Sequence, residues 1–449
     1  MKKILLKGGC LVTMDKTIGQ LNIGDLLIEN NKITDVAAQI NTDDAKIIDA
    51  QGMIVMPGIV DSHIHTWQTG IRGIAGDWTM GQYLRGMHAN LATGFKPDDI
   101  YLGNLAGALT QMNSGVTTLF DWSHNNPTPD HTDAAIDGLL ESGIRAVFGH
   151  GSPKPDPKKG QKHFSEVPHP ASEIKRLREG RLSQNDALVT LGMCILGPHY
   201  STYEVTQKDL LLAREYNLLV SAHMSGGFNR LVPDGIYKMR DDKLLSPKLN
   251  IVHGNDLSDE ELKILIDSGV KMTITPEVEI QMGFGDPITG RVMKFGGKPS
   301  VGVDVESNIS GDMFNVMRMA LQIQRMIDNR PFASERKAIE KLSISAIQAL
   351  EWATINGAEM LGLDDKIGSL TPGKEADIIL LRSTDFNLHP ANNPINAIVF
   401  YANASNVDTV LIAGEIIKQN GKLLYSETSN VMEKLKKSGE NILANSGNN

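Results

Sequence analysis

Metal-binding residue types recur along this chain directly after short apolar segments. His63 and His65, two positions apart, follow the apolar segment 54–61. Alternate side chains of an extended segment share a face, so both imidazoles can reach one ion. Seven of the 12 histidines lie at or just beyond the end of such a segment, as does one aspartate. Beyond the first pair these residues are His124, His150, His199, His223, His253 and Asp304.

The residue types in this set suggest a particular chemistry. Imidazole nitrogens with one carboxylate suit Zn²⁺, and also Fe²⁺, Mn²⁺ or Co²⁺, better than Mg²⁺ or Ca²⁺. Three histidines and Asp304 would leave one coordination position open for water, as catalytic sites do. A lone histidine such as His124 or His150 is more often a hydrogen-bonded core or surface residue. The whole set, rather than any one member, predicts a catalytic metal centre.

Such a centre needs a scaffold that brings many strand ends together. Short apolar segments alternate with helical patterns over about 300 residues, which indicates a parallel sheet covered on both faces. Eight such units favour a (β/α)₈ barrel, whose sites form at the C-terminal ends of the strands. The predicted strands are 54–61, 116–121, 144–149, 188–197, 218–222, 249–252, 270–275 and 299–303.

Local signals mark several helix boundaries. Ser142-Gly143 and Ser268-Gly269 follow helical patterns, and glycine takes the left-handed conformation that ends a helix without a Cβ clash. Thr206 with Asp209, and Ser258 with Glu261, have the spacing of a capping box at a helix start.

Both ends of the chain differ from this middle part, because short strand-like segments dominate there.

The composition limits the classes of function. The chain has 449 residues, a formal net charge of −9 at pH 7 and 41% hydrophobic residues. A chain this apolar can form a core, which excludes intrinsic disorder, and its acidic balance argues against nucleic-acid partners.

The apolar run near the start is too short for a signal peptide or a membrane span. Cys10 and Cys194 form no disulfide framework, so we predict a cytoplasmic protein without membrane contact.

Several motifs resemble those of the amidohydrolase superfamily, in the branch of triazine hydrolases, guanine deaminase and methylthioadenosine/adenosylhomocysteine deaminases. The resemblance covers essentially the whole chain. The motifs are Met56-Pro57-Gly58-Ile59-Val60-Asp61-Ser62-His63-Ile64-His65, Gly115-Val116-Thr117-Thr118, Gly197-Pro198-His199, Val252-His253 and Pro372-Gly373-Lys374-Glu375-Ala376-Asp377.

The resemblance implies an α/β fold in which a TIM-type barrel carries a small β-sandwich domain built from both termini. The implied parts are residues 1–56, the barrel at 57–361, and 362–449 with a terminal helix and tail. It also implies a small-molecule substrate and a homo-oligomer, either a dimer or a tetramer.

The family pattern also assigns roles to individual residues. It implies four metal ligands, namely His63, His65, His223 and Asp304. His253 would contact the metal-bound water, His199 would contact the substrate, and Gln68, Glu277 and His124 are further candidate substrate contacts. No lysine ends the fourth strand, so one metal is expected rather than two bridged by a carboxylated lysine.

Two departures from the pattern affect the substrate prediction. Relatives that deaminate purines or pyrimidines place a glutamate three residues after the strand-five histidine, where this chain has Gly226. They also carry a histidine two residues before the strand-seven proline, where this chain has Ile274. Glu277 or Glu279 could supply the missing acid, although either could equally be a solvated loop carboxylate.

The predicted chemistry is hydrolysis at an sp² carbon by a metal-bound hydroxide, with Asp304 as the general base. The first hypothesis is an aminohydrolase acting on a carbon–nitrogen bond of a small heterocyclic or cyclic amide substrate. The second is a hydrolase that releases another group from a carbamate, thiocarbamate or chlorotriazine. The third is a non-catalytic binding protein, which the complete set of expected ligands disfavours.

Overall fold

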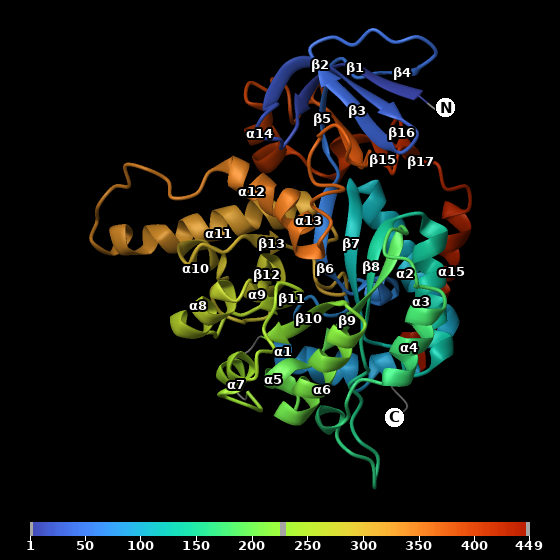
Figure 1. Ribbon diagram of the computed structural model, residues 1–449, viewed down its shortest axis with the longest axis vertical. Helices are drawn as coiled ribbons and strands as arrows, with labels where there is room; N and C mark the ends of the chain where they lie inside the picture. Colours follow the sequence, from blue (N-terminus) through green and yellow to red (C-terminus); the bar gives the residue numbers. More distant parts are fainter. Residues whose placement is uncertain (1–2, 225–229, 446–449) are drawn as a thin grey trace.

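The computed structural model describes residues 3–224 and 230–445, which form two β-sheets surrounded by helices (Figure 1). In these residues one sheet has eight parallel strands in sequential order. Its outermost strands meet where Ile64 and Asp304 form a parallel bridge. The sheet is thereby nearly closed into the predicted barrel. Its strands are β6 (Ile59–Ile64), β7 (Val116–Ser123), β8 (Arg145–His150), β9 (Val189–Ile195), β10 (Leu219–Met224), β11 (Leu249–His253), β12 (Lys271–Ile274) and β13 (Pro299–Val301).

Each predicted barrel strand overlaps an observed one, but the first predicted segment, 54–61, is divided between the two sheets. Met53–Pro57 is strand β5 of the terminal sheet, and β6 of the barrel begins at Ile59. Gly58 lies between them, where a Cβ would come within 2.0 Å of the Thr117 Oγ1. Because an apolar run suits a strand in either sheet, the sequence pattern did not reveal this change of sheet.

Helices connect the barrel strands and cover them. The predicted end of α3 at Gly143 is confirmed, with a φ of 77°, and so is the capping box of α8 at Ser258. The predicted start at Thr206 is wrong: Thr202 caps α6 through the Val205 N–H. These and the other main helices are α2 (Pro97–Asn113), α3 (Pro129–Ser142), α4 (Ala171–Glu179), α6 (Tyr203–Glu215), α7 (Gly235–Asp241), α8 (Asp259–Asp267), α11 (Met313–Ser334), α12 (Ala346–Trp352), α13 (Ile355–Leu361) and α15 (Thr428–Asn445).

Both ends of the chain contribute to the second sheet, as predicted. Along β5, Ile54 and Met56 pack into the main core with the barrel, whereas Val55 packs into a separate core of the terminal sheet. This alternation lets one strand bury both faces. The strands of this sheet are β1 (Lys3–Val12), β2 (Gln20–Glu29), β3 (Lys32–Ala37), β4 (Lys46–Asp49), β5, β14 (Ile378–Arg382), β15 (Val407–Ile412), β16 (Glu415–Gln419) and β17 (Lys422–Leu423).

A buried ion cluster joins the terminal sheet to the start of the barrel strands. Arg145, the first residue of β8, donates through Nε to Asp377 (2.9 Å) and through Nη2 to Glu375 (2.5 Å). The Gly58 N–H, at the start of β6, donates to the Asp377 carbonyl (2.9 Å). The terminal sheet therefore lies at the N-terminal end of the barrel and leaves the C-terminal end free for a site. The division of the chain at residues 56/57 and 361/362 stays a prediction.

No helix among the described residues has the length and apolar character needed to cross a membrane.

Candidate metal centre

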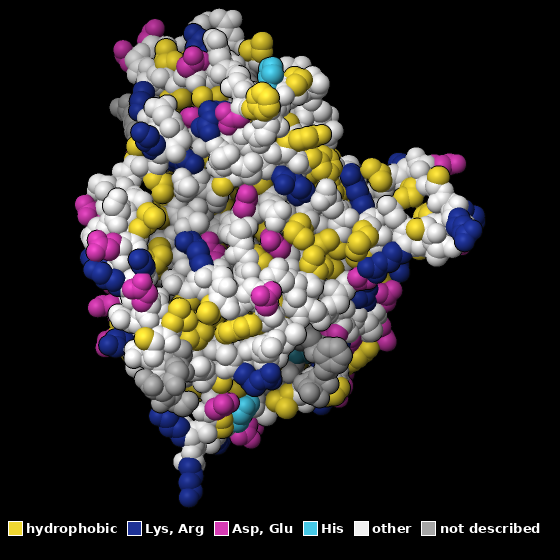
Figure 2. All heavy atoms as spheres, turned by 180° about the vertical axis from the view of Figure 1, so that it is seen from behind, with side chains coloured by type: hydrophobic (Ala, Val, Ile, Leu, Met, Phe, Trp, Pro, Cys, Tyr) yellow, Lys and Arg dark blue, Asp and Glu magenta, His cyan; other side chains and the backbone are white. Residues whose placement is uncertain are grey.

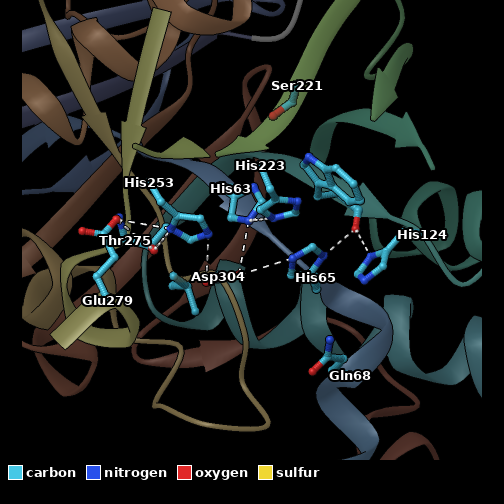
Figure 3. Close-up of polar contacts among 12 residues, drawn as sticks. His63, His65, Gln68, His124, Ser221, His223, His253, Thr275, Glu279 and Asp304 are labelled. Carbon is cyan, nitrogen blue, oxygen red and sulfur yellow. Dashed lines mark hydrogen bonds and ion pairs between the residues drawn. The ribbon is translucent and has the colours of Figure 1, made fainter. Parts of the chain in front are cut away.

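Three histidines and an aspartate converge at the C-terminal end of the barrel strands (Figure 3). His63 and His65 come from the end of β6, His223 comes from β10, and Asp304 follows β13. The His63 Nε2 lies 3.2 Å from the Asp304 Oδ1 and 3.2 Å from the His223 Nε2. The His65 Nε2 lies 3.3 Å from the same Asp304 oxygen. The sequence motifs thus place four potential ligands around one point.

Three of the distances between these atoms match those around a single tetrahedral ion, and the ligand atoms of His63, His223, His253 and Asp304 all lie within 4.8 Å of one another, so His253 is also near this point. Ligand atoms bound at roughly 2.0–2.1 Å to such an ion are about 3.3 Å from one another. The contacts at the His63 Nε2 and at the Asp304 Oδ1 have this length. The donor set therefore suits a divalent transition ion.

The protonation of the side chains also suits metal binding. The His65 Nδ1 lies 2.6 Å from the Trp122 carbonyl, which can only accept, so the Nε2 keeps its lone pair for an ion. Burial lowers the pKa of His63 to about 3 and the pKa of His223 well below its ordinary value, so both rings are neutral. Burial would raise the pKa of Asp304, but the contacts of its carboxylate with the rings of His63 and His65 hold it below its ordinary value.

Two residues of the site have an unfavourable backbone conformation. His253, at the end of β11, and Asp304 both have a φ of 71°, in the left-handed region that side chains with a Cβ seldom adopt. Such a conformation costs about 1–3 kcal/mol and persists where the surrounding structure enforces it, most often at functional sites. In both residues it turns the side chain at the end of a strand toward the centre (Figure 3).

His253 faces the Asp304 carboxylate from the side. Its Nε2 lies 3.8 Å from the Asp304 Oδ2, which is longer than the contacts of the other histidines. Its Nδ1 lies 3.0 Å from the Thr275 Oγ1 and 3.3 Å from the Glu279 Oε1. Glu279 is fully buried and also accepts from the Thr275 N–H (2.8 Å). Two side chains thus fix the orientation of the His253 ring.

The predicted substrate contacts are not all brought to the cavity beside this cluster. His124 lines the cavity, and its ring lies 4.4 Å from that of His65. Gln68 lies behind the wall, where it bonds the Tyr83 hydroxyl and Ser307. Glu277 accepts from Asn315 (2.9 Å), and neither it nor His199 is among the described residues that line the cavity. Gly226 lies outside the described residues.

The cavity has a volume of about 260 Å³, enough for a small cyclic molecule. One wall holds His65, His223, His253 and Asp304. The others are formed by the segment 80–89, the loop 151–170 and residues around 282–284. The loop 151–170 is long and rich in proline, and its position at the cavity agrees with a role in binding.

Sequence reasoning missed three residues of this cavity region. Lys154, His88 and Tyr83 line the cavity, yet none belongs to a recognisable motif. The Lys154 ammonium lies 5.3 Å from the ring centre of Trp122 and 5.7 Å from that of Tyr200. A long segment rich in proline, 151–170, was the only sequence feature near Lys154, and its composition does not indicate which residue points inward.

A parallel barrel with such a donor set at its C-terminal end is suited to metal-assisted hydrolysis. Residues 54–417 match the amidohydrolase family, and the chain belongs to that family. Among its curated relatives, a 5'-deoxyadenosine deaminase of Methanothermobacter thermautotrophicus is 29% identical, over 92% of this chain and 94% of the relative. A 5-methylthioadenosine/S-adenosylhomocysteine deaminase of Carboxydothermus hydrogenoformans is 27% identical, over 98% of each chain.

Solved structures share the fold. The atrazine chlorohydrolase TrzN from Arthrobacter aurescens, complexed with zinc, superposes with a TM-score of 0.84 at 22% identity, over 97% of this chain and all of the other. An adenosine deaminase from Xanthomonas campestris with bound zinc gives 0.83 at 19% identity, over 99% of each chain. The matches confirm the predicted family and fold, and with the family a hydrolase.

Proposed function

We propose that this chain is a metal-dependent aminohydrolase that releases ammonia or an amine from a small heterocyclic or cyclic amide substrate. One observation carries the proposal: three imidazole nitrogens and a carboxylate converge at the wall of a small cavity. The leaving group is inferred from the curated relatives, which are named as deaminases of adenosine derivatives.

In this proposal His63, His65, His223 and Asp304 would hold one divalent ion, Zn²⁺ in the first place, with Fe²⁺, Mn²⁺ or Co²⁺ as alternatives. When bound, such an ion supplies a water molecule whose pKa is lowered toward neutrality. The ligand geometry above supports this assignment, in which a single Asp304 oxygen contacts both His63 and His65.

Asp304 and His253 would handle the proton and the orientation of the attacking water. The second Asp304 oxygen, Oδ2, faces the His253 Nε2 rather than the other histidines. It is therefore available to take the proton of the water and pass it to the leaving group. Thr275 and Glu279 hold the opposite edge of the His253 ring, which fixes where its Nε2 points. His124, which lines the cavity, is the predicted substrate contact that we retain.

A second candidate function is hydrolysis with a leaving group other than an amine. Gly226 stands where deaminating relatives carry the glutamate that protonates a ring nitrogen. Without an acid at that position, a group that leaves as an anion is easier to expel than an amine. This reaction would use the same Asp304 and the same ligands. A cytoplasmic location and a homo-oligomeric state remain predictions.

Ammonia release by Zn²⁺-loaded protein, screened across purines, pyrimidines, triazines and hydantoins, tests the proposal. It predicts ammonia from at least one of these classes, with loss of the product after chelation and in an Asp304→Asn variant. Release of chloride or a thiol without ammonia would replace the first function with the second. Turnover that survives both chelation and Asp304→Asn would reject metal-dependent hydrolysis at this site.

A further inference from the structure

Lys154 brings a positive charge to the cavity without an acidic partner. Its ammonium lies over the faces of Trp122 and Tyr200, at 5.3 and 5.7 Å from the ring centres. Across residues 3–224 and 230–445, no carboxylate lies within ion-pair distance of this lysine, and Asp156, which also lines the cavity, forms no ion pair with it. The charge therefore faces the cavity beside two aromatic rings, without an ion pair, and the Asp304 carboxylate acts on it only from a distance.

Lys154 is partly buried, so its ammonium has lost part of its hydration, and no ion pair among the described residues replaces it. Burial of a charge is unfavourable unless an opposite charge or hydrogen bonds replace the water. Aromatic faces attract a cation and compensate only in part. Burial also lowers the pKa of Lys154 to about 8, which leaves the side chain mostly charged at neutral pH. An anion entering the cavity would provide the missing partner.

The position of this charge relative to the metal centre is fixed by Trp122. The Trp122 ring lies 4.2 Å from the ring of His223, and the Trp122 carbonyl accepts from His65. The same indole thus packs against a candidate ligand and against the ammonium. A small molecule held at the centre is therefore within reach of Lys154, and the two sites can act on one ligand.

We propose that Lys154 selects substrates that carry a negatively charged oxygen next to the ring or amide that is hydrolysed. The inference rests on the proposed function, since it names the class of molecule that this site accepts. Lys154 contributes to binding, and the reaction itself stays with Asp304. The charged oxygen can belong to a carboxylate or to an ionised cyclic imide, because either accepts a hydrogen bond from the ammonium.

Matched ligand pairs can isolate the effect of this charge. Uracil with orotate, and nicotinamide with nicotinate, differ mainly by an anionic carboxylate. Their affinities for Zn²⁺-loaded protein would be measured by isothermal titration calorimetry. A carboxylate can also bind the metal directly, so the comparison is made between protein variants as well as between ligands.

The test variant is Lys154→Met, and its control is Lys158→Met on the same loop. Lys158 is exposed. Figure 2 shows basic side chains at the tip of the segment that projects at the bottom of the molecule. The control removes the same charge from the loop without touching the cavity. We expect wild type and Lys158→Met to bind at least one carboxylate more tightly than its neutral partner. Lys154→Met should lose about 10- to 100-fold of that affinity, as expected for a charge-assisted hydrogen bond.

Two results would overturn the inference. One is that no carboxylate binds more tightly than its neutral partner, and the other is that Lys154→Met keeps the preference. A melting temperature of Lys154→Met well below that of wild type, without ligand, would show instead that the lysine supports the fold. If wild type binds carboxylates through Lys154 but hydrolyses nothing, the preference of Lys154 for anionic ligands stands and the proposed function falls. Hydrolysis without the preference would reject the inference and leave the proposed function in place.

Discussion

Both ends of the barrel bury charged and polar side chains, but they pair them differently. At the N-terminal end Arg145 is bonded to Asp377 and Glu375, and Asp377 also accepts from the Ala413 N–H (2.8 Å). At the C-terminal end, in contrast, no lysine or arginine of the described residues pairs with the Asp304 carboxylate, which faces the rings of His63, His65 and His253.

The contrast indicates which end holds the fold and which end awaits a ligand. A buried carboxylate needs an opposite charge, and Asp304 has no lysine or arginine among the described residues to provide it. The C-terminal end combines this carboxylate with the strained backbone at His253 and Asp304. We therefore expect substitutions at this end to change activity, and substitutions at the N-terminal end to change stability.

The largest expected effect is on turnover, at the C-terminal end. Asp304→Asn keeps the shape and one ligand oxygen but cannot accept a proton from water. Activity should fall by roughly two to four orders of magnitude, the range for a general base, while much of the metal is retained. Turnover and metal content would be measured together. Equal loss of both, with rescue by excess metal, would make Asp304 a ligand only, and near wild-type turnover would remove it from the reaction.

The counterpart at the N-terminal end is Arg145→Met. This change leaves Asp377 and Glu375 without their buried partner, and breaking such a cluster lowers the free energy of unfolding by about 3–5 kcal/mol. Urea denaturation measures the loss, and turnover per folded molecule should stay near wild type. Arg181→Met is the control, because its pairs with Asp133 and Asp137 are largely exposed and contribute about 0–1 kcal/mol. Equal stability of the two variants would contradict the comparison.

A smaller effect on turnover should separate two neighbouring carboxylates that the sequence left open. Glu279 contacts the His253 ring, so Glu279→Gln should lower kcat by about 10- to 100-fold, as for other residues that orient a site histidine. Glu277 is bonded to Asn315 outside the cavity, so Glu277→Gln should change kcat far less. Steady-state kinetics on both variants would decide, and the reverse order of effects would return Glu277 to the site.

The smallest effect at neutral pH, which grows as the pH falls, concerns stability in acid. Burial, and then the charge of Arg176, lower the pKa of His150 from 6.5 to about 3. The unfolded chain therefore takes up a proton at this residue before the folded chain does. Between pH 6.5 and about 3, the free energy of unfolding should fall by about 1.4 kcal/mol for each unit of decreasing pH from this residue. His150→Gln should reduce that slope in urea denaturation series, and an unchanged slope would contradict the assignment.

Much of the fold and family could be predicted from the sequence because their signals are local. Apolar runs of strand length and the residues that follow them are adjacent in the chain, so His63 and His65 predict a shared site. The histidines of later strands could be added because parallel strands all end at the same edge of the barrel. The division of 54–61 between two sheets could not be predicted, since both sheets accept the same residue types.

Long-range contacts explain the other limits. Nothing around Lys154 in the sequence indicates that its side chain lies over Trp122. Trp122 belongs to β7, whereas Lys154 lies in a loop. Similarly, two acidic residues two positions apart, Glu277 and Glu279, have different surroundings because α9 (Pro276–Gln281) turns them to different sides. The direction of a side chain depends on the packing of the whole molecule, which no local pattern describes.

The central claim is that one metal ion binds at the converging side chains of His63, His65, His223 and Asp304. Anomalous diffraction at the zinc edge, from crystals of the Zn²⁺-loaded protein, tests this most directly. We predict one strong peak for each chain, at about 2.0–2.1 Å from the three Nε2 atoms and in contact with the Asp304 carboxylate. A second peak of similar strength in the same cavity, or no peak among these four residues, would contradict it.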